Sequence, residues 1–132
     1  MIKHTLSVLA FMVITLAVQG GSHFWLNKNH YDALTFTRDQ PIMPMGIAAM
    51  IIQGIIMTTA LHIWRGPEVQ LGQGILIAVA FGLFLGSYIS LAEPAKYAAP
   101  SILQWVRVEA VSTILQFGTF GILLGLIHRK FA

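Results

Sequence analysis

Four apolar segments, each long enough to cross a lipid bilayer, occupy most of this chain of 132 residues. A bilayer core of roughly 30 Å needs about 20 apolar residues in a helix. The segments that reach this length cover residues 5–26, 42–64, 73–97 and 102–128. Only 10% of the residues are charged, whereas soluble domains carry roughly 25%. The sequence therefore predicts an all-α protein with one membrane domain, residues 1–132, folded as a four-helix transmembrane bundle of antiparallel up-down topology.

Charge and cysteine content narrow the possible partners. The chain has no cysteine, which excludes disulfides and cysteine-bound metals. Its net charge of +3 does not come from a Lys/Arg cluster, so the lipid bilayer is a predicted partner and nucleic acid is not. Four Lys/Arg residues fall on each side of the membrane, but Lys96 and Arg107 lie among acids within or beside helices. When these two are discounted, the side with the termini has more Lys/Arg residues than the other side. Because cytoplasmic segments carry an excess of Lys/Arg, this predicts that both termini are cytoplasmic.

Small residues mark the third and fourth segments as packing helices. The third segment repeats them every four positions, at Ala78, Gly82, Gly86 and Ser90. The fourth contains Gly118, Gly121 and Gly125. Small residues let helix backbones approach one another in lipid. Two such ridges exceed what one hairpin needs, so we predict that part of them contacts other transmembrane helices, in a homo-oligomer or a larger complex.

Ionisable residues gather where the third segment turns into the fourth. Glu93 and Lys96 are three residues apart and can form an ion pair. Pro94 removes one helical hydrogen bond, which frees the carbonyl of Ser90. A hairpin folded about residues 99–100 sets Ser90 level with Glu109, where a polar stripe begins on the fourth segment. The predicted polar cluster comprises Glu93, Lys96, Glu109, Gln116, Gln53 and Ser90.

Two interpretations of this cluster remain open. Ionisable groups inside a span are costly and are often functional, which predicts a site for a polar ligand or ion. A balanced set of acids and bases can equally form an ion-paired clamp that fixes the register of the hairpin.

The connection between the first two segments is long and polar. Its length fits a lid over the cluster or an ordinary interfacial segment. Its candidate ligand contacts are His23, His30, Asp32 and Arg38. Two alternatives involve cofactors, namely copper held by His23, His30, Met43 and Met45, or haem held by His62 and His128. Neither spacing is diagnostic, so no cofactor is predicted.

Catalysis is not predicted, because no nucleophile motif or glycine-rich phosphate loop is present. Two classes of function remain. The first is a non-catalytic accessory subunit or helix-packing partner of a membrane complex or homo-oligomer. The second is a small carrier or receptor that binds a polar ligand or ion in the polar cluster. Four helices leave little room for alternating access, which favours the first class.

Three runs extend over most of the chain, from about residue 20 to residue 128: YDALTFTRDQPIMPMGIAAMIIQGIIM, SLAEPAKY and EAVSTILQFGTFGILLGLIH. They contain an arginine-acid-x-proline entry, a Gln-Gly pair in mid-helix and a Gln-Phe pair in the last span. With these features the chain resembles a family of small four-span bacterial membrane proteins, a domain of unknown function. The resemblance implies a four-helix fold in the bacterial inner membrane, and it supplies no activity.

Overall fold

The computed structural model describes all 132 residues, and most of them are helical. Four helices are long and apolar enough to span a membrane, namely Ile2–Leu26, Met43–Arg65, Leu71–Lys96 and Ile102–Lys130. Their limits fall within three residues of the predicted ones. The structure thus confirms four helical spans and no strands, and it describes an integral membrane protein whose exposed apolar side chains face lipid.

Two of the spans are built from more than one helical element. In chain order the elements are α1 (Ile2–Gly21), η1 (Ser22–Leu26), α2 (Lys28–Asp32), α3 (Met43–Arg65), α4 (Leu71–Ser87), η2 (Tyr88–Ala92), α5 (Glu93–Lys96) and α6 (Ile102–Lys130). Both η elements are single π-helical turns that widen a span near one end. Such turns recur at functional sites in helical proteins.

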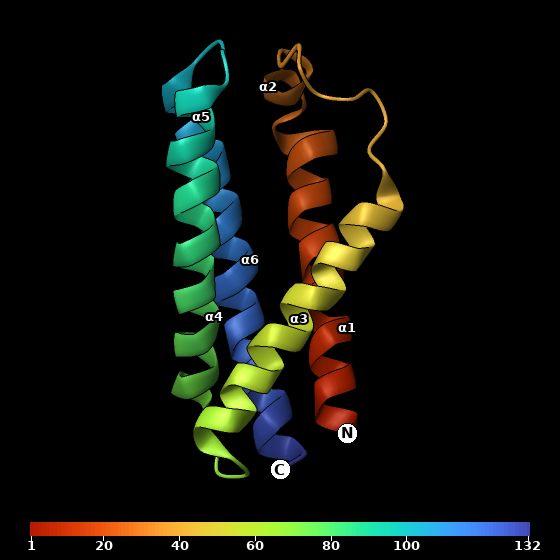
Figure 1. Cartoon of the computed structure of the whole chain (residues 1–132), viewed down its shortest axis with the longest axis vertical. Coiled ribbons are helices and arrows are strands. Elements are labelled where there is room, and N and C mark those ends of the chain that lie inside the picture. The colour runs from red at the N-terminus through yellow and green to blue at the C-terminus, as the bar shows by residue number, and fades with distance from the viewer.

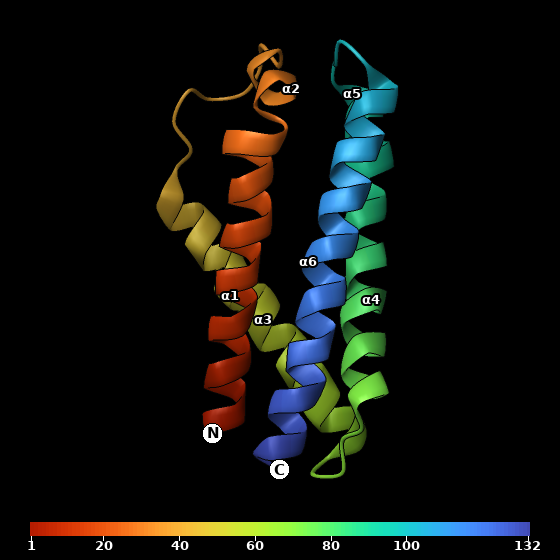
Figure 2. The same cartoon turned by 180° about the vertical axis from the view of Figure 1, so that it is seen from behind.

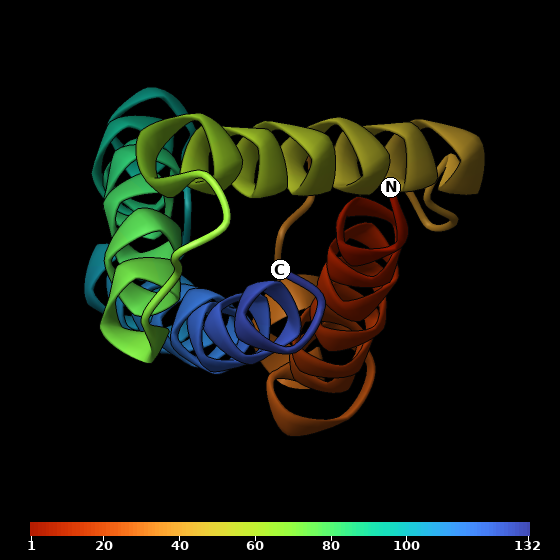
Figure 3. The same cartoon turned by 90° about the horizontal axis from the view of Figure 1, so that it is seen from below.

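The helices are not arranged as four parallel columns. Figures 1 and 2 show α4 and α6 side by side along their length, with α1 on the other side of α6 and α3 running obliquely across the group. Seen from below, α3 runs along one side of the group formed by α1, α4 and α6 (Figure 3). Both termini lie at one end, called the termini end here, and α2 and α5 lie at the other, called the far end (Figure 1).

Local signals in the sequence explain where the helices begin and end. Gly66 has a positive φ of 61°, which stops α3 directly after Arg65. Pro44 lies in the first turn of α3, where its missing N–H costs nothing. The hydroxyl oxygen of Ser101 accepts a hydrogen bond from the amide of Gln104 at 3.2 Å and caps α6. These three boundaries lie within one residue of the predicted ones.

Small residues set the contact between α4 and α6. The opposed pairs are Gly74 with Gly125, Ala78 with Gly121, Gly82 with Phe117, and Gly86 with Thr113. This is the predicted register, in which Ser90 is level with Glu109. A β-carbon on Gly74 would lie only 2.3 Å from the Gly125 amide nitrogen, so the two backbones touch. Because α4 covers Gly121 and Gly125, these two glycines do not belong to the part of the ridges that is open to another chain.

An aromatic layer fills the middle of the bundle. The ring of Phe11 on α1 lies 4.9 Å from Phe120 and 5.7 Å from Phe117, both on α6. Met57 and Leu61 of α3 are buried against the same cluster. This apolar layer separates polar side chains at the far end from a second polar group at the termini end.

Candidate functional site

The polar stripe of α6 faces α1. Ser112 donates a hydrogen bond to Ser22 at 3.2 Å, and Ser22 accepts another from Asn27. Gln116 donates to Thr15 and accepts from Gln19, each at 2.8 Å. We call these residues, together with Glu109 and its partner Tyr31, the far-end network. The stripe and the face of α6 that packs on α4, which includes Phe117 and Gly121, lie about 100° apart around the helix axis. This is the angle between residues that are adjacent in an α-helix, such as Gln116 and Phe117.

Glu109 is the charged member of the far-end network. It is 7% exposed and lies about 10 Å into α6 from the first residue of that helix. Its carboxylate accepts a hydrogen bond from the Tyr31 hydroxyl at 2.7 Å. The one ion pair of the chain joins Lys28 and Asp32 on the surface of α2, so no base neutralises Glu109. A buried carboxylate without a counter-charge is costly.

The predicted ion-paired clamp does not form. Lys96 is exposed, and its ammonium donates to the Tyr88 hydroxyl at 2.5 Å instead of to Glu93. Helical side chains point toward the helix N-terminus, which directs Lys96 back along α5 and η2. Glu93 is half-buried and lies near enough to Glu109 for the two charges to repel. The two acids therefore come together without the base that was expected between them.

Pro94 frees a carbonyl, but not the predicted one. In an α-helix its missing N–H would leave Ser90 without a donor, whereas the i to i+5 pattern of η2 shifts the free carbonyl to Ile89. The Ile89 carbonyl accepts the indole N–H of Trp105 at 2.9 Å. The freed acceptor thus ties α4 to α6.

The polar residues of the first connection are only partly brought to the far-end network. His23 stacks on Tyr31 with ring centroids 3.6 Å apart, and its Nδ1 donates to the Gln19 carbonyl. His30 is buried against Tyr31 and Trp105, and its Nε2 has no partner. Asp32 pairs with Lys28 on the surface, and Arg38 lies in an exposed segment, residues 35–42. Phe36 of that segment stacks on Tyr97, so the connection reaches the α5–α6 turn.

The side chains that were suggested as copper or haem ligands come from three of the four spans and from the first connection. No group of three or more His, Cys, Asp or Glu side chains in the structure could hold a metal ion. Met43 and Met45 are exposed at the start of α3, away from His23 and His30. His62 and His128 do lie at the same end of the bundle, where His4 stands beside both.

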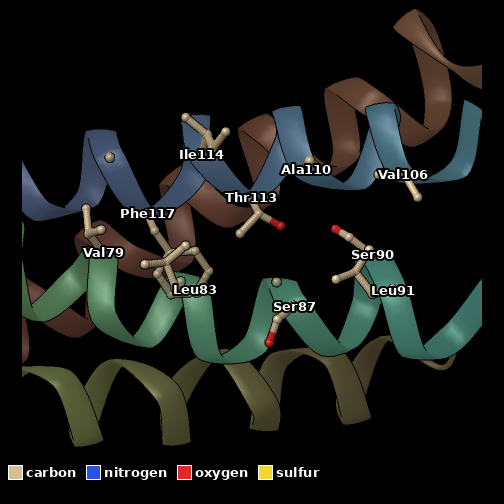
Figure 4. A pocket seen from close by; sticks show the side chains of 13 residues that line it. Val79, Leu83, Ser87, Ser90, Leu91, Val106, Ala110, Thr113, Ile114 and Phe117 are labelled. Carbon is tan, nitrogen blue, oxygen red and sulfur yellow. The ribbon is translucent and has the colours of Figure 1, made fainter. Parts of the chain in front are cut away.

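A groove of about 440 Å³ runs along the surface between α4 and α6. Small residues line it, among them Gly82, Gly86, Ala110 and Gly118, and Val79, Leu83 and Ile114 form apolar walls (Figure 4). The hydroxyls of Ser90 and Thr113 point toward one another within it (Figure 4). Ser90 is 6% exposed, and its hydroxyl has no hydrogen-bond partner. The groove thus combines an apolar surface with an unsatisfied donor.

Gln53 is not part of the far-end network. It lies on α3, half-buried and without a side-chain hydrogen bond. The first residues of α3, 43–49, are all exposed, and a β-carbon on Gly46 would meet nothing within 4 Å. The first two turns of α3 therefore have no helix against them in the single chain.

Sequence reasoning missed the partners of the stripe on α6. These partners are Thr15, Gln19, Ser22 and Tyr31. Three of them recur at i, i+4 and i+7 along the first span, and the polar residues of α6 recur at the similar helical spacing i, i+3 and i+7. Two matching polar stripes in separate spans are a signal that could have paired α1 with α6.

The phenol of Tyr31 is expected to titrate above its ordinary pKa of 10.0, because burial and then the negative charge of Glu109 raise the pKa. A raised pKa in the fold means that the neutral phenol stabilises the protein fully below about pH 10 and that this stability declines as the pH rises further. The absorbance of tyrosinate in wild type minus Tyr31→Phe measures the titration. Glu109→Gln should lower the Tyr31 pKa part of the way, since burial remains. An unchanged Tyr31 pKa in that variant would contradict a contribution of Glu109 to the shift.

Comparison of the chain with protein-family models, with curated proteins and with solved structures found no match. The function is therefore argued from the geometry of the chain itself.

Proposed function

We propose that this protein is a non-catalytic membrane subunit that packs against a transmembrane helix of another chain, and that the helix docks in the α4–α6 groove. The observation that carries the proposal is the buried, unpaired hydroxyl of Ser90 among small residues in an apolar groove. In lipid, small residues permit close approach of a second backbone, and a buried hydroxyl gains from an acceptor on the neighbouring helix.

The exposed first turns of α3 and the amide of Gln53 support the same function. Gln53 carries an amide near mid-bilayer without a partner in the chain. Such amides hydrogen-bond across helices in membranes. A partner helix that covers residues 43–49 and continues along α3 to Gln53 offers this amide a hydrogen-bond partner.

The location that goes with this function is the bacterial inner membrane, in an antiparallel topology with both termini in the cytoplasm. The resemblance to small four-span bacterial proteins supports the membrane. The Lys/Arg residues at the termini end, none of them paired with an acid, support the orientation.

Gly118→Leu tests the groove. No atom lies within 4 Å of a β-carbon on Gly118, so the single chain should accept leucine while the groove is filled. We expect the mass of the particle extracted in mild detergent, measured by native mass spectrometry, to fall to that of the monomer. We expect the affinity between the chains to fall at least about tenfold, which corresponds to a loss of about 1.4 kcal/mol of binding free energy.

Gly20→Leu is the matched control, because Gly20 on α1 is equally unobstructed and lies outside the groove. It should leave the particle mass unchanged. A wild-type particle that is monomeric in native-like lipid would contradict the proposal, as would a Gly118→Leu particle of unchanged mass.

A second candidate function, a receptor or carrier for a small cation, rests on Glu109. This buried carboxylate has a neutral phenol as its hydrogen-bond partner and no base beside it. A bound cation would supply the missing charge. It would also lower the pKa of Tyr31, so the tyrosinate titration reports its binding. Sodium, potassium and methylammonium can be compared in wild type and in Glu109→Gln. A Tyr31 pKa that is the same with all three would eliminate this candidate for them.

A further inference from the structure

Basic side chains from three helices meet at the termini end. Lys3 and His4 lie in the first turn of α1, His62 near the end of α3 and His128 near the end of α6. The ring of His4 lies 5.2 Å from that of His62 and 5.6 Å from that of His128. We call these four residues the basic cluster. It shares no residue with the far-end network or with the groove.

Two members of the basic cluster are buried with unused hydrogen-bonding groups. Lys3 is 8% exposed, yet it forms no ion pair. His128 is fully buried, and its Nδ1 has no partner. Its Nε2 lies 2.7 Å from the Thr58 hydroxyl, which also lies 3.0 Å from Nδ1 of His4. A lysine in a largely buried position gains from an opposite charge beside it, and no acidic side chain of the chain pairs with Lys3.

The charge of the whole molecule is concentrated at the same end. The Lys/Arg residues there are Lys3, Arg65, Arg129 and Lys130, and the acid in the adjoining turn is Glu68. At the far end, four Lys/Arg residues are balanced by four acids. The formal charge of +3 therefore belongs entirely to the termini end. The local field attracts anions toward the basic cluster.

We propose that the basic cluster binds a phosphate group. Lys3 supplies the positive charge, and the imidazoles supply N–H donors around it. His4 is partly exposed and His62 is exposed, so these two give access from the surface, whereas His128 closes the buried side. The Thr58 hydroxyl has one hydrogen, so it donates to one imidazole and accepts from the other. When Thr58 donates to Nε2 of His128, the Nδ1 of that ring carries a proton and can donate to the anion.

The phosphate group can belong to an anionic lipid headgroup or to a free phosphate ion, and both present the same chemical group. The cluster lies in the first turn of α1 and the last turns of α3 and α6, at the level where a bilayer places its headgroups. Basic pockets between membrane helices hold anionic lipid headgroups. A free phosphate in solution would meet the same donors. The experiment therefore uses both sources, on the full chain.

In the lipid arm, the protein is placed in nanodiscs of phosphatidylcholine with a small fraction of phosphatidylglycerol, and lipid retained by the extracted protein is measured by native mass spectrometry. In the second arm, inorganic phosphate is titrated against protein in phosphatidylcholine alone, with thermal stability as the readout. We expect enrichment of phosphatidylglycerol, stabilisation by phosphate, or both. Lys3→Met should weaken binding by about tenfold or more, the factor expected for one charge-assisted hydrogen bond.

Lys130→Met is the matched control, because Lys130 lies at the same end but is exposed. It should change binding by less than about twofold, as a surface charge does. If Lys3→Met fails to fold, His62→Gln serves instead, since His62 is exposed and forms no hydrogen bond within the chain. Enrichment of phosphatidylglycerol without stabilisation by inorganic phosphate assigns the site to a lipid headgroup. Stabilisation by phosphate without enrichment of the lipid assigns it to a free anion. Neither effect in wild type, or equal losses in Lys3→Met and Lys130→Met, would overturn the proposal.

Discussion

Gly74→Ala should destabilise the protein, while Gly118→Ala should leave its stability unchanged or raise it. A β-carbon on Gly74 would lie 2.3 Å from the amide nitrogen of Gly125 and 2.8 Å from the Gly121 carbonyl, and neither backbone atom can move cheaply. Overpacking of this kind costs about 1–3 kcal/mol, and occasionally more. At Gly118 the added methyl group meets nothing, and alanine is favoured over glycine in a helix by up to about 1 kcal/mol.

The two variants change the same residue type on the two helices of one hairpin, so their difference isolates the close approach of α4 and α6. Unfolding in detergent, followed by the loss of helical circular dichroism, measures both. Gly125→Ala should behave like Gly74→Ala, since its β-carbon would lie 2.7 Å from the Leu71 carbonyl. Equal stability of Gly74→Ala and Gly118→Ala would mean that the two helices are further apart than the structure describes.

Trp105→Phe is expected to cost about 1–3 kcal/mol, because it leaves the Ile89 carbonyl without its hydrogen bond. The need for that bond arises from Pro94, which has no N–H to offer. Pro94→Ala restores a backbone donor, so the cost of Trp105→Phe should be smaller in the Pro94→Ala background. A double-mutant cycle of unfolding free energies measures this coupling, which should be at least about 0.5 kcal/mol.

Trp25→Phe is the control for the loss of indole. Trp25 is 84% exposed and forms no hydrogen bond within the chain, whereas Trp105 is 6% exposed. The control should be close to neutral. If Pro94→Ala leaves the cost of Trp105→Phe unchanged, that cost comes from packing and not from the freed carbonyl.

The spans and the α4–α6 register were predictable because they depend on features that are local in the sequence. Apolar length defines the spans, Gly66 and Ser101 define helix ends, and the short turn at residues 97–101 leaves little freedom in how the hairpin closes. The small residues of α4 then settle which face meets α6. Each of these signals acts over a few residues, and each held in the structure.

The far-end network was less predictable because it depends on which helix covers the second face of α6. Glu109 and Gln116 were singled out correctly as part of one stripe, but their partners come from α2 and α1, about 80–100 residues away in the chain. The Lys96 side chain was placed wrongly because the exposed Tyr88 hydroxyl competes with Glu93 for it. The shift of the free carbonyl from Ser90 to Ile89 followed from a π-helical turn, which Pro94 alone does not reveal.

The aromatic layer around Phe11 has a consequence for transport across this chain. Between Gln116 and His128, a distance of about 18 Å along α6, the buried side chains are Phe117, Phe120 and Leu124, together with two glycines. These residues offer no oxygen or nitrogen atom to stabilise a moving proton or a file of water molecules. The nearest buried hydroxyl on α1 is that of Ser7, one turn before Phe11. We therefore expect the aromatic layer to resist the passage of ions through the single chain. Any conductance recorded from it in a planar bilayer should require movement of Phe11 or Phe120, or a pathway formed between chains.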